Sequence, residues 1–172
     1  MNILETIKLG SNLLRKREIC SHILDSEILL SNILQKSREK ILVNLDQKLN
    51  SKNILKFKKY IRRRSKNEPV AYILGEKEFW SKKFIVNKDT LIPRPETELL
   101  VEKLVELFKG KKISILDIGT GSGCIILSLL GNLDKSVGLG VDVSNKAILI
   151  ANKNAERHEL SNRVKFLNKS FE

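Results

Sequence analysis

The sequence predicts an α/β protein with an N-terminal helical bundle, a β-hairpin linker and then part of a Rossmann-like domain. Apolar residues recur at helical spacing through the first 67 residues, and short β-rich runs follow them. Beyond residue 110, strand-like apolar runs alternate with helical ones, which is typical of βαβ units and a parallel sheet. We therefore expect a helical domain at 1–67, a hairpin linker at 68–92 and the Rossmann-like part at 93–172.

Several helices are predicted in the first 67 residues. Asp25 and Ser26, placed ahead of an apolar run, indicate a helix start with Glu27 in its first turn. Ser37 and Ser51 indicate two further starts. The apolar residues that share a helical face include Ile3, Leu4 and Ile7 near the N-terminus and Ile54, Phe57 and Ile61 in the last helix.

A proline separates these helices from the expected linker. Pro69 disfavours helix at the residue before it, and the runs "VAYILGEKEFW" and "KKFIVNK" are rich in residues that favour strands. We expect them to form a hairpin. Pro93 and Pro95 then stiffen a loop, and the next helix is expected to begin near Glu96 and to end at Gly110.

The last part of the chain predicts three parallel strands with two helices between them. The strands are expected in "KISILDIG", "SVGLGVDVS" and "RVKFLN", and the helices in "CIILSLLGN" and "NKAILIANKNAERHEL". In the second helix, Ala147, Ile148 and Ala151 are expected to face inward.

The positive charge is concentrated in the N-terminal part. The net charge of the whole chain is +12, while residues 1–70 alone hold 16 Lys and Arg against 7 Asp and Glu, a net of +9. No acid lies between Asp46 and Glu68. Such a field favours an acidic partner or a nucleic acid, although a solvated helix face in a lysine-rich proteome explains it equally well. Only Phe57 and Tyr60 interrupt the basic run, so no platform for stacking bases is predicted.

Other classes of protein are disfavoured. The N-terminal residues lack a basic stretch followed by an apolar core, and the apolar runs are too short to span a membrane, so we expect a cytoplasmic protein with neither signal peptide nor membrane anchor. Cys20 and Cys124 lie far apart without metal-ligand spacing. We expect both to be buried thiols in a reducing compartment, and we expect no metal site.

Three glycines mark the turn from the first parallel strand into the next helix. Gly119, Gly121 and Gly123 form a G-x-G-x-G pattern, with Asp117 two residues ahead. A dinucleotide-binding fingerprint needs a glycine where Cys124 stands, and a phosphate-binding loop needs a lysine and a hydroxyl after the glycines. Neither condition is met, so a pyrophosphate ligand is not predicted.

The pattern instead suits S-adenosylmethionine, which carries no phosphate. The glycines let the backbone approach the amino-acid end of this cofactor closely, and the carboxylate of Asp117 can bind its ammonium group. Asp142 ends the second strand, at the edge where parallel sheets bind ligands, and can accept both ribose hydroxyls. Three structural alternatives remain open: a tight turn for the glycines, a helix-dipole role for Asp117, and a cap for the helix starting near Asn145 for Asp142.

Three blocks of sequence carry a family resemblance. "EPVAYILGEKEFW", "LIPRPETELLVE" and "ILDIGTGSGCI" together resemble the release factor glutamine methyltransferase family. The resemblance implies an N-terminal helical bundle, a hairpin linker and a methyltransferase domain. It also implies transfer of a methyl group from S-adenosylmethionine to the side-chain amide of the glutamine in the Gly-Gly-Gln motif of class-1 peptide chain release factors. The implied partners are release factors 1 and 2, and the implied state is a cytoplasmic monomer.

The same resemblance assigns residues. The implied cofactor loop is Gly119, Thr120, Gly121, Ser122 and Gly123, and Asp117 precedes it. Asp142 is implied to bind the ribose of the cofactor. Phe171 stands where the family has a tryptophan beside the adenine, and Ser170 replaces the acid that precedes it. The residues implied to line the entrance for the substrate loop are Arg94, Pro95 and Glu96.

One family feature is not in the sequence. The Asn-Pro-Pro-Tyr loop that receives the target amide in the family is absent before the chain ends at Glu172, so no catalytic residue is assigned. We expect the sheet to have an open, apolar edge. Two alternatives to the methyltransferase reading stay open: a binding module without turnover that uses the basic bundle, and a nucleic-acid methyltransferase.

Overall fold

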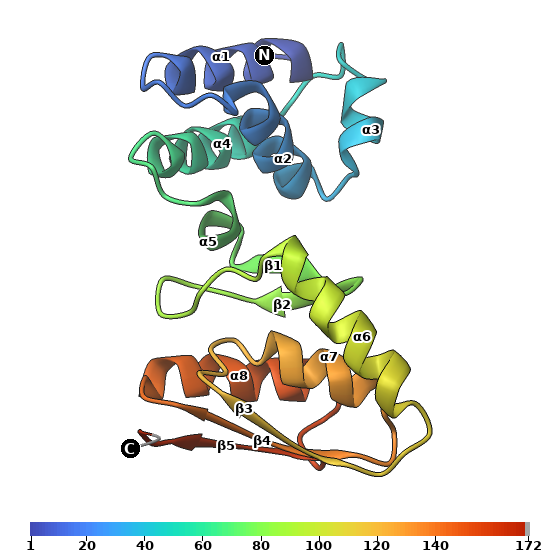
Figure 1. Ribbon diagram of the computed structural model, residues 1–172. Coiled ribbons are helices and arrows are strands. Elements are labelled where there is room, and N and C mark those ends of the chain that lie inside the picture. Colours follow the sequence, from blue (N-terminus) through green and yellow to red (C-terminus); the bar gives the residue numbers. More distant parts are fainter. Residues whose placement is uncertain (171–172) are drawn as a thin grey trace. The chain divides into compact units, whose positions relative to one another are not determined.

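The computed structural model describes residues 1–170, so Phe171 and the role expected for it lie outside the described residues. The chain divides into two compact units, Met1–Leu74 and Gly75–Glu172, which are drawn in Figure 1. The three-part division at residues 67 and 92 stays a prediction.

The first unit is a bundle of helices, as predicted. Its core is a continuous apolar cluster in which Ile3, Leu14, Leu29, Ile41 and Phe57 are fully buried. Asn2 and Glu5 form a capping box at the start of the first helix, with hydrogen bonds of 2.8 and 2.9 Å. The helices are α1 (Ile3–Arg15), α2 (His22–Leu34), α3 (Arg38–Leu42), α4 (Ser51–Arg64) and α5 (Val70–Leu74).

One of the three predicted helix starts needs correction. Ser37 caps α3 and α4 begins at Ser51, as expected, with Asn50 as the cap of α4. The predicted start of α2 at Asp25 was wrong, because that helix begins at His22. Asp25 is buried and pairs with Arg64 of α4 at 2.7 Å, so its carboxylate serves helix packing and not a cap.

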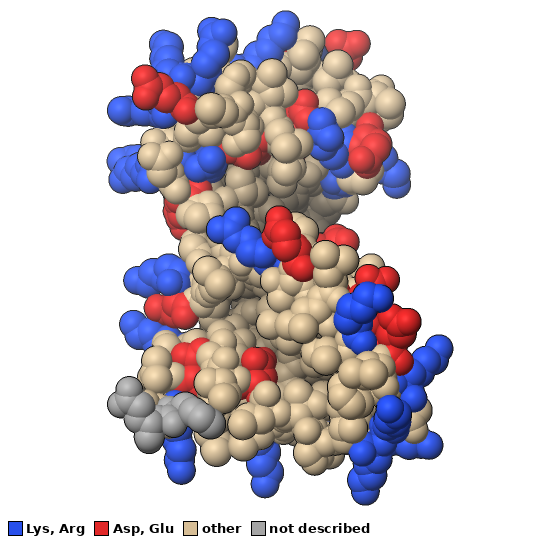
Figure 2. Space-filling view, in the orientation of Figure 1, with Lys and Arg blue, Asp and Glu red and all other residues tan. Residues whose placement is uncertain are grey.

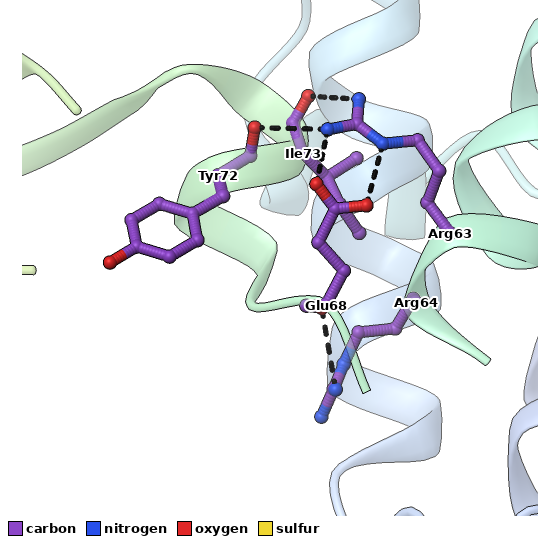
Figure 3. A network of polar contacts seen from close by, with 5 residues as sticks. All are labelled: Arg63, Arg64, Glu68, Tyr72 and Ile73. Atoms are coloured by element: carbon purple, nitrogen blue, oxygen red, sulfur yellow. Dashed lines mark hydrogen bonds and ion pairs between the residues drawn. The ribbon is translucent and has the colours of Figure 1, made fainter. Parts of the chain in front are cut away.

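The predicted strand at the start of the hairpin was also wrong, because Val70–Leu74 is the short helix α5. Pro69 fixes its own backbone for a helix start, and its carbonyl accepts the N–H groups of Tyr72 and Ile73 at 3.0 and 3.1 Å. The guanidinium of Arg63 donates to the carbonyls of Tyr72 and Ile73 (Figure 3). These contacts and the burial of Ile73 outweigh the β-forming composition of the segment.

An arginine network ties α4 to this helix. Arg63 also forms a two-pronged ion pair with Glu68, and Arg64 donates to the Glu68 carbonyl (Figure 3). The hydrogen bond from Arg63 lowers the pKa of the Glu68 carboxyl. Arg63 and Arg64 therefore hold the first unit together and are not free surface charges.

The second unit begins with the predicted hairpin. Strands β1 (Glu76–Phe79) and β2 (Lys82–Ile85) pair antiparallel, and Trp80 and Ser81 connect them with positive φ angles of 52° and 55°. A two-residue turn with both angles positive matches the right-handed twist of the strands. The prolines then lead into the 3₁₀ turn η1 (Pro95–Thr97), and α6 (Glu98–Phe108) follows it.

The remaining elements form the predicted parallel sheet. The strand order is β3-β4-β5, and both neighbouring pairs are parallel. Figure 1 shows α7 and α8 on the same face of this sheet. Ala147, Ile148 and Ala151 of α8 are buried, as expected. The elements are β3 (Ser114–Ile118), α7 (Cys124–Asn132), β4 (Val137–Asp142), α8 (Asn145–Arg157) and β5 (Val164–Asn168).

The other face of the sheet is apolar and uncovered within residues 1–170. Leu116 and Ile118 of β3 are 51% and 54% exposed, and β3 pairs with β4 alone among the described strands. The expectation of an open apolar edge stays a prediction. None of the helices within residues 1–170 is both long and apolar enough to cross a membrane.

The two cysteines differ from each other. Both are free thiols, and Cys124 is partly buried, but the expectation that Cys20 is buried was wrong because it is exposed. It lies in the connection between α1 and α2, where its neighbour Ile19 fills the buried position.

Candidate cofactor site

The backbone of the glycine segment is fixed by the end of β4. The N–H groups of Gly119 and Thr120 both donate to the carbonyl of Val141, at 2.9 and 3.0 Å. Gly119 and Gly121 have φ angles of +74° and +56°, which favour glycine strongly. A Cβ added at Gly119 would meet nothing within 4 Å, so the glycine is required by the backbone conformation and the space above it is open.

Asp142 holds the same segment from the neighbouring strand. One carboxylate oxygen accepts the N–H of Gly121 at 2.9 Å, and the other accepts the N–H of Ser144 at 2.8 Å. The alternative role as cap of α8 was wrong, because the Ser144 hydroxyl performs it by accepting the N–H of Ala147. A carboxylate has about four acceptor sites, so Asp142 keeps capacity for a ligand.

Asp117 is largely buried at the end of β3. It accepts a hydrogen bond from the Thr120 hydroxyl at 2.8 Å. Burial raises the pKa of Asp117, the nearby charge of Asp142 raises it further, and contacts with Thr120 and with the backbone of Ile126 oppose the rise. Because Ile126 lies in the first turn of α7, the helix-dipole role remains compatible with the structure.

A small hollow brings the glycine segment together with the proline loop. Its volume is about 110 Å³, and Arg94 is the one predicted entrance residue that lines it. Pro95 and Glu96 are exposed in η1 and do not line the hollow. The other lining residues are Leu91, Ile92, Pro93, Thr97, Gly119, Thr120, Gly121, Ser122, Cys124 and Ile125.

Thr120 and Ser122 are buried polar residues that line this hollow, and Cys124 beside them is partly buried. The Ser122 hydroxyl has no hydrogen-bond partner of good geometry within residues 1–170, and its side chain lies near the Cys124 thiol. Burial raises the pKa of Cys124 to about 11. The thiol is therefore neutral at physiological pH and is a poor nucleophile.

Asn154 joins the glycine segment to the hairpin and was missed by the sequence reasoning. This α8 side chain is fully buried. Its amide oxygen accepts the N–H of Ile85 at 2.7 Å, and its amide nitrogen donates to the carbonyls of Ile85 at 3.0 Å and Ser122 at 2.8 Å. The available signal was its position: Asn154 stands three residues after Ala151 on the inward face of the predicted helix.

Comparison with known proteins adds two domain matches. The PrmC N-terminal domain matches residues 5–75, and a methyltransferase domain matches residues 109–172. The release factor glutamine methyltransferase of Leptospira interrogans is 45% identical over 157 residues, covering 90% of this chain and 54% of that protein. The enzyme of the same name from Coxiella burnetii is 44% identical over 140 residues, covering 81% of this chain and 50% of that protein.

Over most of its length the chain is similar in sequence to release factor glutamine methyltransferases. A bifunctional methyltransferase of Rickettsia conorii is 38% identical over 183 residues, covering 92% of this chain and 35% of that protein. This chain thus spans about half the length of the release factor glutamine methyltransferases that it matches. A solved methyltransferase from Geobacter sulfurreducens in complex with S-adenosyl-L-homocysteine is similar over 44% of this chain and 29% of that chain, at 26% identity and a TM-score of 0.38.

The relationship leaves the catalytic residues unassigned. The sequence contains no Asn-Pro-Pro-Tyr segment. Within residues 1–170, no group of three or more His, Cys, Asp or Glu side chains could hold a metal ion. The described residues form a small hollow beside the glycine segment.

The buried amide of Asn154 is expected to stabilise this site. In Asn154→Ala, the N–H of Ile85 and the carbonyl of Ser122 lose their partner, and each buried polar group left unpaired costs about 1–3 kcal/mol. We expect a lower free energy of unfolding in urea, with the change confined to the second unit. Asn152→Ala removes an exposed amide two residues away and serves as the control, with an expected effect within about 0.5 kcal/mol. Equal effects of the two variants would contradict the role of Asn154.

The buried carboxylate of Asp117 is expected to lower stability at neutral pH. The pKa of Asp117 is raised in the folded protein, so the folded state binds this proton more tightly than the unfolded state does. The resulting stabilisation is complete at pH values below the ordinary aspartate pKa of about 3.9, and it is lost as the pH rises through the pKa of Asp117 in the folded protein. Asp117→Asn should therefore raise the melting temperature at pH near 7 and leave it unchanged at a pH of about 3. The exposed Asp134→Asn is the matched control. A lower melting temperature of Asp117→Asn at neutral pH would show that the charge stabilises the fold.

Proposed function

We propose that the chain binds S-adenosylmethionine and belongs to a protein that methylates the glutamine amide of the Gly-Gly-Gln motif in peptide chain release factors 1 and 2. The observation that carries the proposal is the hollow where the open backbone of the glycine segment meets Arg94 of the proline loop. The relationship to release factor glutamine methyltransferases supports the choice of cofactor and substrate. We place this protein in the cytoplasm as a monomer.

Each cofactor group has a candidate partner. The ammonium of the methionine end suits Asp117, because its largely buried carboxylate lies near the like charge of Asp142. The backbone from Gly119 to Gly123 leaves room for that end, and the remaining acceptor sites of Asp142 suit the ribose hydroxyls. The hollow is smaller than the 300–1,000 Å³ or so of a site for a whole drug-sized ligand, so it would take the methionine end alone.

The proposed reaction is a direct methyl transfer. The amide nitrogen of glutamine attacks the methyl carbon, the carbon–sulfur bond breaks, and sulfur keeps the electron pair as the cofactor becomes S-adenosylhomocysteine. The nitrogen loses a proton to water. Such a reaction gains most from holding nitrogen and methyl in line, so its acceleration comes from proximity and orientation. Arg94, Pro95 and Glu96 are proposed to guide the substrate loop to this point.

A second candidate is a binding unit without turnover. The basic run between Asp46 and Glu68, which no acid interrupts, favours it. In this case the chain would hold the cofactor and a release factor but transfer no methyl group.

The cofactor proposal predicts that Asp142 contributes to affinity. Asp142→Ala should weaken S-adenosylmethionine binding by about 1–3 kcal/mol, the usual scale for hydrogen bonds to a charged group. Asp142→Asn keeps an acceptor for the Gly121 N–H and should lose less. Titration calorimetry measures both, with the exposed Asp134→Ala as control. Equal affinity of all the variants would remove Asp142 from the site.

The substrate proposal predicts activity in a longer chain. A chimera that continues this chain with the remaining part of the Leptospira interrogans relative should transfer labelled methyl to a release factor, and not to a factor whose Gly-Gly-Gln glutamine is alanine. The 172-residue chain alone should transfer none. Labelling of the alanine variant by the chimera would contradict the proposed substrate, and transfer by the short chain would contradict the need for an acceptor loop.

A further inference from the structure

Helix α4 has one apolar face and one cationic face. Phe57 and Ile61 are buried in the core of the first unit. Several residues of the opposite face stand three or four apart, which places them on one side of the helix. Figure 2 shows Lys and Arg side chains of the first unit projecting into solvent. The exposed cations of α4 and of the residues just after it, here called the α4 basic face, are Lys52, Lys56, Lys58, Lys59, Arg62 and Lys66.

The cations of the α4 basic face have no acidic partners. Arg63 and Arg64 form ion pairs with Glu68 and Asp25 inside the first unit. Within residues 1–170, none of the six side chains of the basic face forms an ion pair. They are therefore the cations of this helix that remain available to an external partner.

The α4 basic face destabilises its own helix. Within the helix, like charges stand four residues apart at Lys52 and Lys56 and at Lys58 and Arg62. Each such pair costs about 0.2–0.5 kcal/mol. The first turn holds Lys52 and no acid, which also opposes the helix dipole. A face that serves solubility alone can mix both signs of charge, whereas this face gains stability when negative charge approaches it.

The composition of this face fits nucleic acid better than protein. Protein interfaces have apolar centres rich in aromatic residues and poor in lysine. Here the only exposed large apolar side chain within α4 is Leu55, and no aromatic ring of the helix is exposed. A cluster of exposed cations without exposed aromatic rings suits contacts to phosphate oxygens and offers no platform on which bases could stack. A helix of 14 residues is about 20 Å long, enough to follow several phosphates of one strand.

We propose that the α4 basic face binds the phosphate backbone of a nucleic acid. This binding needs neither the cofactor nor the methyl transfer proposed above, so the two proposals stand or fall separately. Because the contacts are to phosphate, affinity falls steeply with salt and depends little on base sequence.

The test is the binding of the 172-residue chain to a fluorescein-labelled RNA duplex, followed by anisotropy at several salt concentrations. The triple variant Lys59→Gln, Arg62→Gln, Lys66→Gln should bind roughly tenfold or more weakly, and the slope of log affinity against log salt should shrink by about two to three. Its melting temperature should stay close to that of the unchanged chain, because the loss of the favourable Arg62 charge from the last turn of α4 offsets the like-charge repulsion that is removed. This readout separates lost contacts from lost structure.

A matched control removes equal charge elsewhere. Lys109→Gln, Lys111→Gln, Lys112→Gln changes three exposed lysines of the second unit. It should lower the affinity much less than the α4 variant does. Equal losses in both variants would mean that only the net charge of +12 matters and would overturn the proposal.

Two further arms decide the kind of partner. The affinity for a DNA duplex, compared with that for the RNA duplex, shows which nucleic acid is preferred. Binding of either duplex that the triple variant weakens supports the proposal. Polyglutamate of equal total charge represents an acidic protein surface. Competition by polyglutamate as strong as that by RNA overturns the proposal in favour of an acidic protein partner, and so does the absence of duplex binding at low salt.

Discussion

The parallel pairing of β3 with β4 is the constraint on which the candidate site depends. It places Val141 beside Ile118, so that the Val141 carbonyl can accept two N–H groups from the glycine segment. Asp142, the next residue, then reaches Gly121. The segment therefore has its shape before any ligand arrives, and little ordering entropy remains to be lost on binding.

The packing beneath the segment depends on a second glycine position. A Cβ at Gly140 of β4 would lie 2.5 Å from the ring of Phe166 and 2.9 Å from the Thr120 hydroxyl. Because Gly140 has no side chain, the ring of Phe166 can lie against β4 directly below the turn. Asn154 completes the support from α8 and connects it to Ile85 of the hairpin. The hairpin is thus structurally coupled to the glycine segment through one buried amide.

An element could be predicted from the sequence when the residues that determine its structure lie within the element itself. The strand, glycine turn and helix from Ser114 to Asn132 follow from an apolar run and from glycines that favour positive φ, and both signals lie within the segment itself. Helix α5 could not be predicted in this way, because the arginine that satisfies its last carbonyls comes from α4. The pairing of Asp25 and the bridging role of Asn154 likewise depend on partners that are distant in the chain, Arg64 and Ile85.

The same distinction changes how the basic helix should be interpreted. In the sequence, Arg62, Arg63 and Arg64 form one run, and reversing all three charges looks like a direct test of a binding surface. In the structure, Arg63 and Arg64 are tied to Glu68 and Asp25, so reversing them would leave buried or half-buried carboxylates facing new acids. Weaker binding by such a variant would then report damaged packing. Only Arg62 of the three belongs to the α4 basic face, and surface binding can be separated from folding only by substitutions that leave its two neighbours intact.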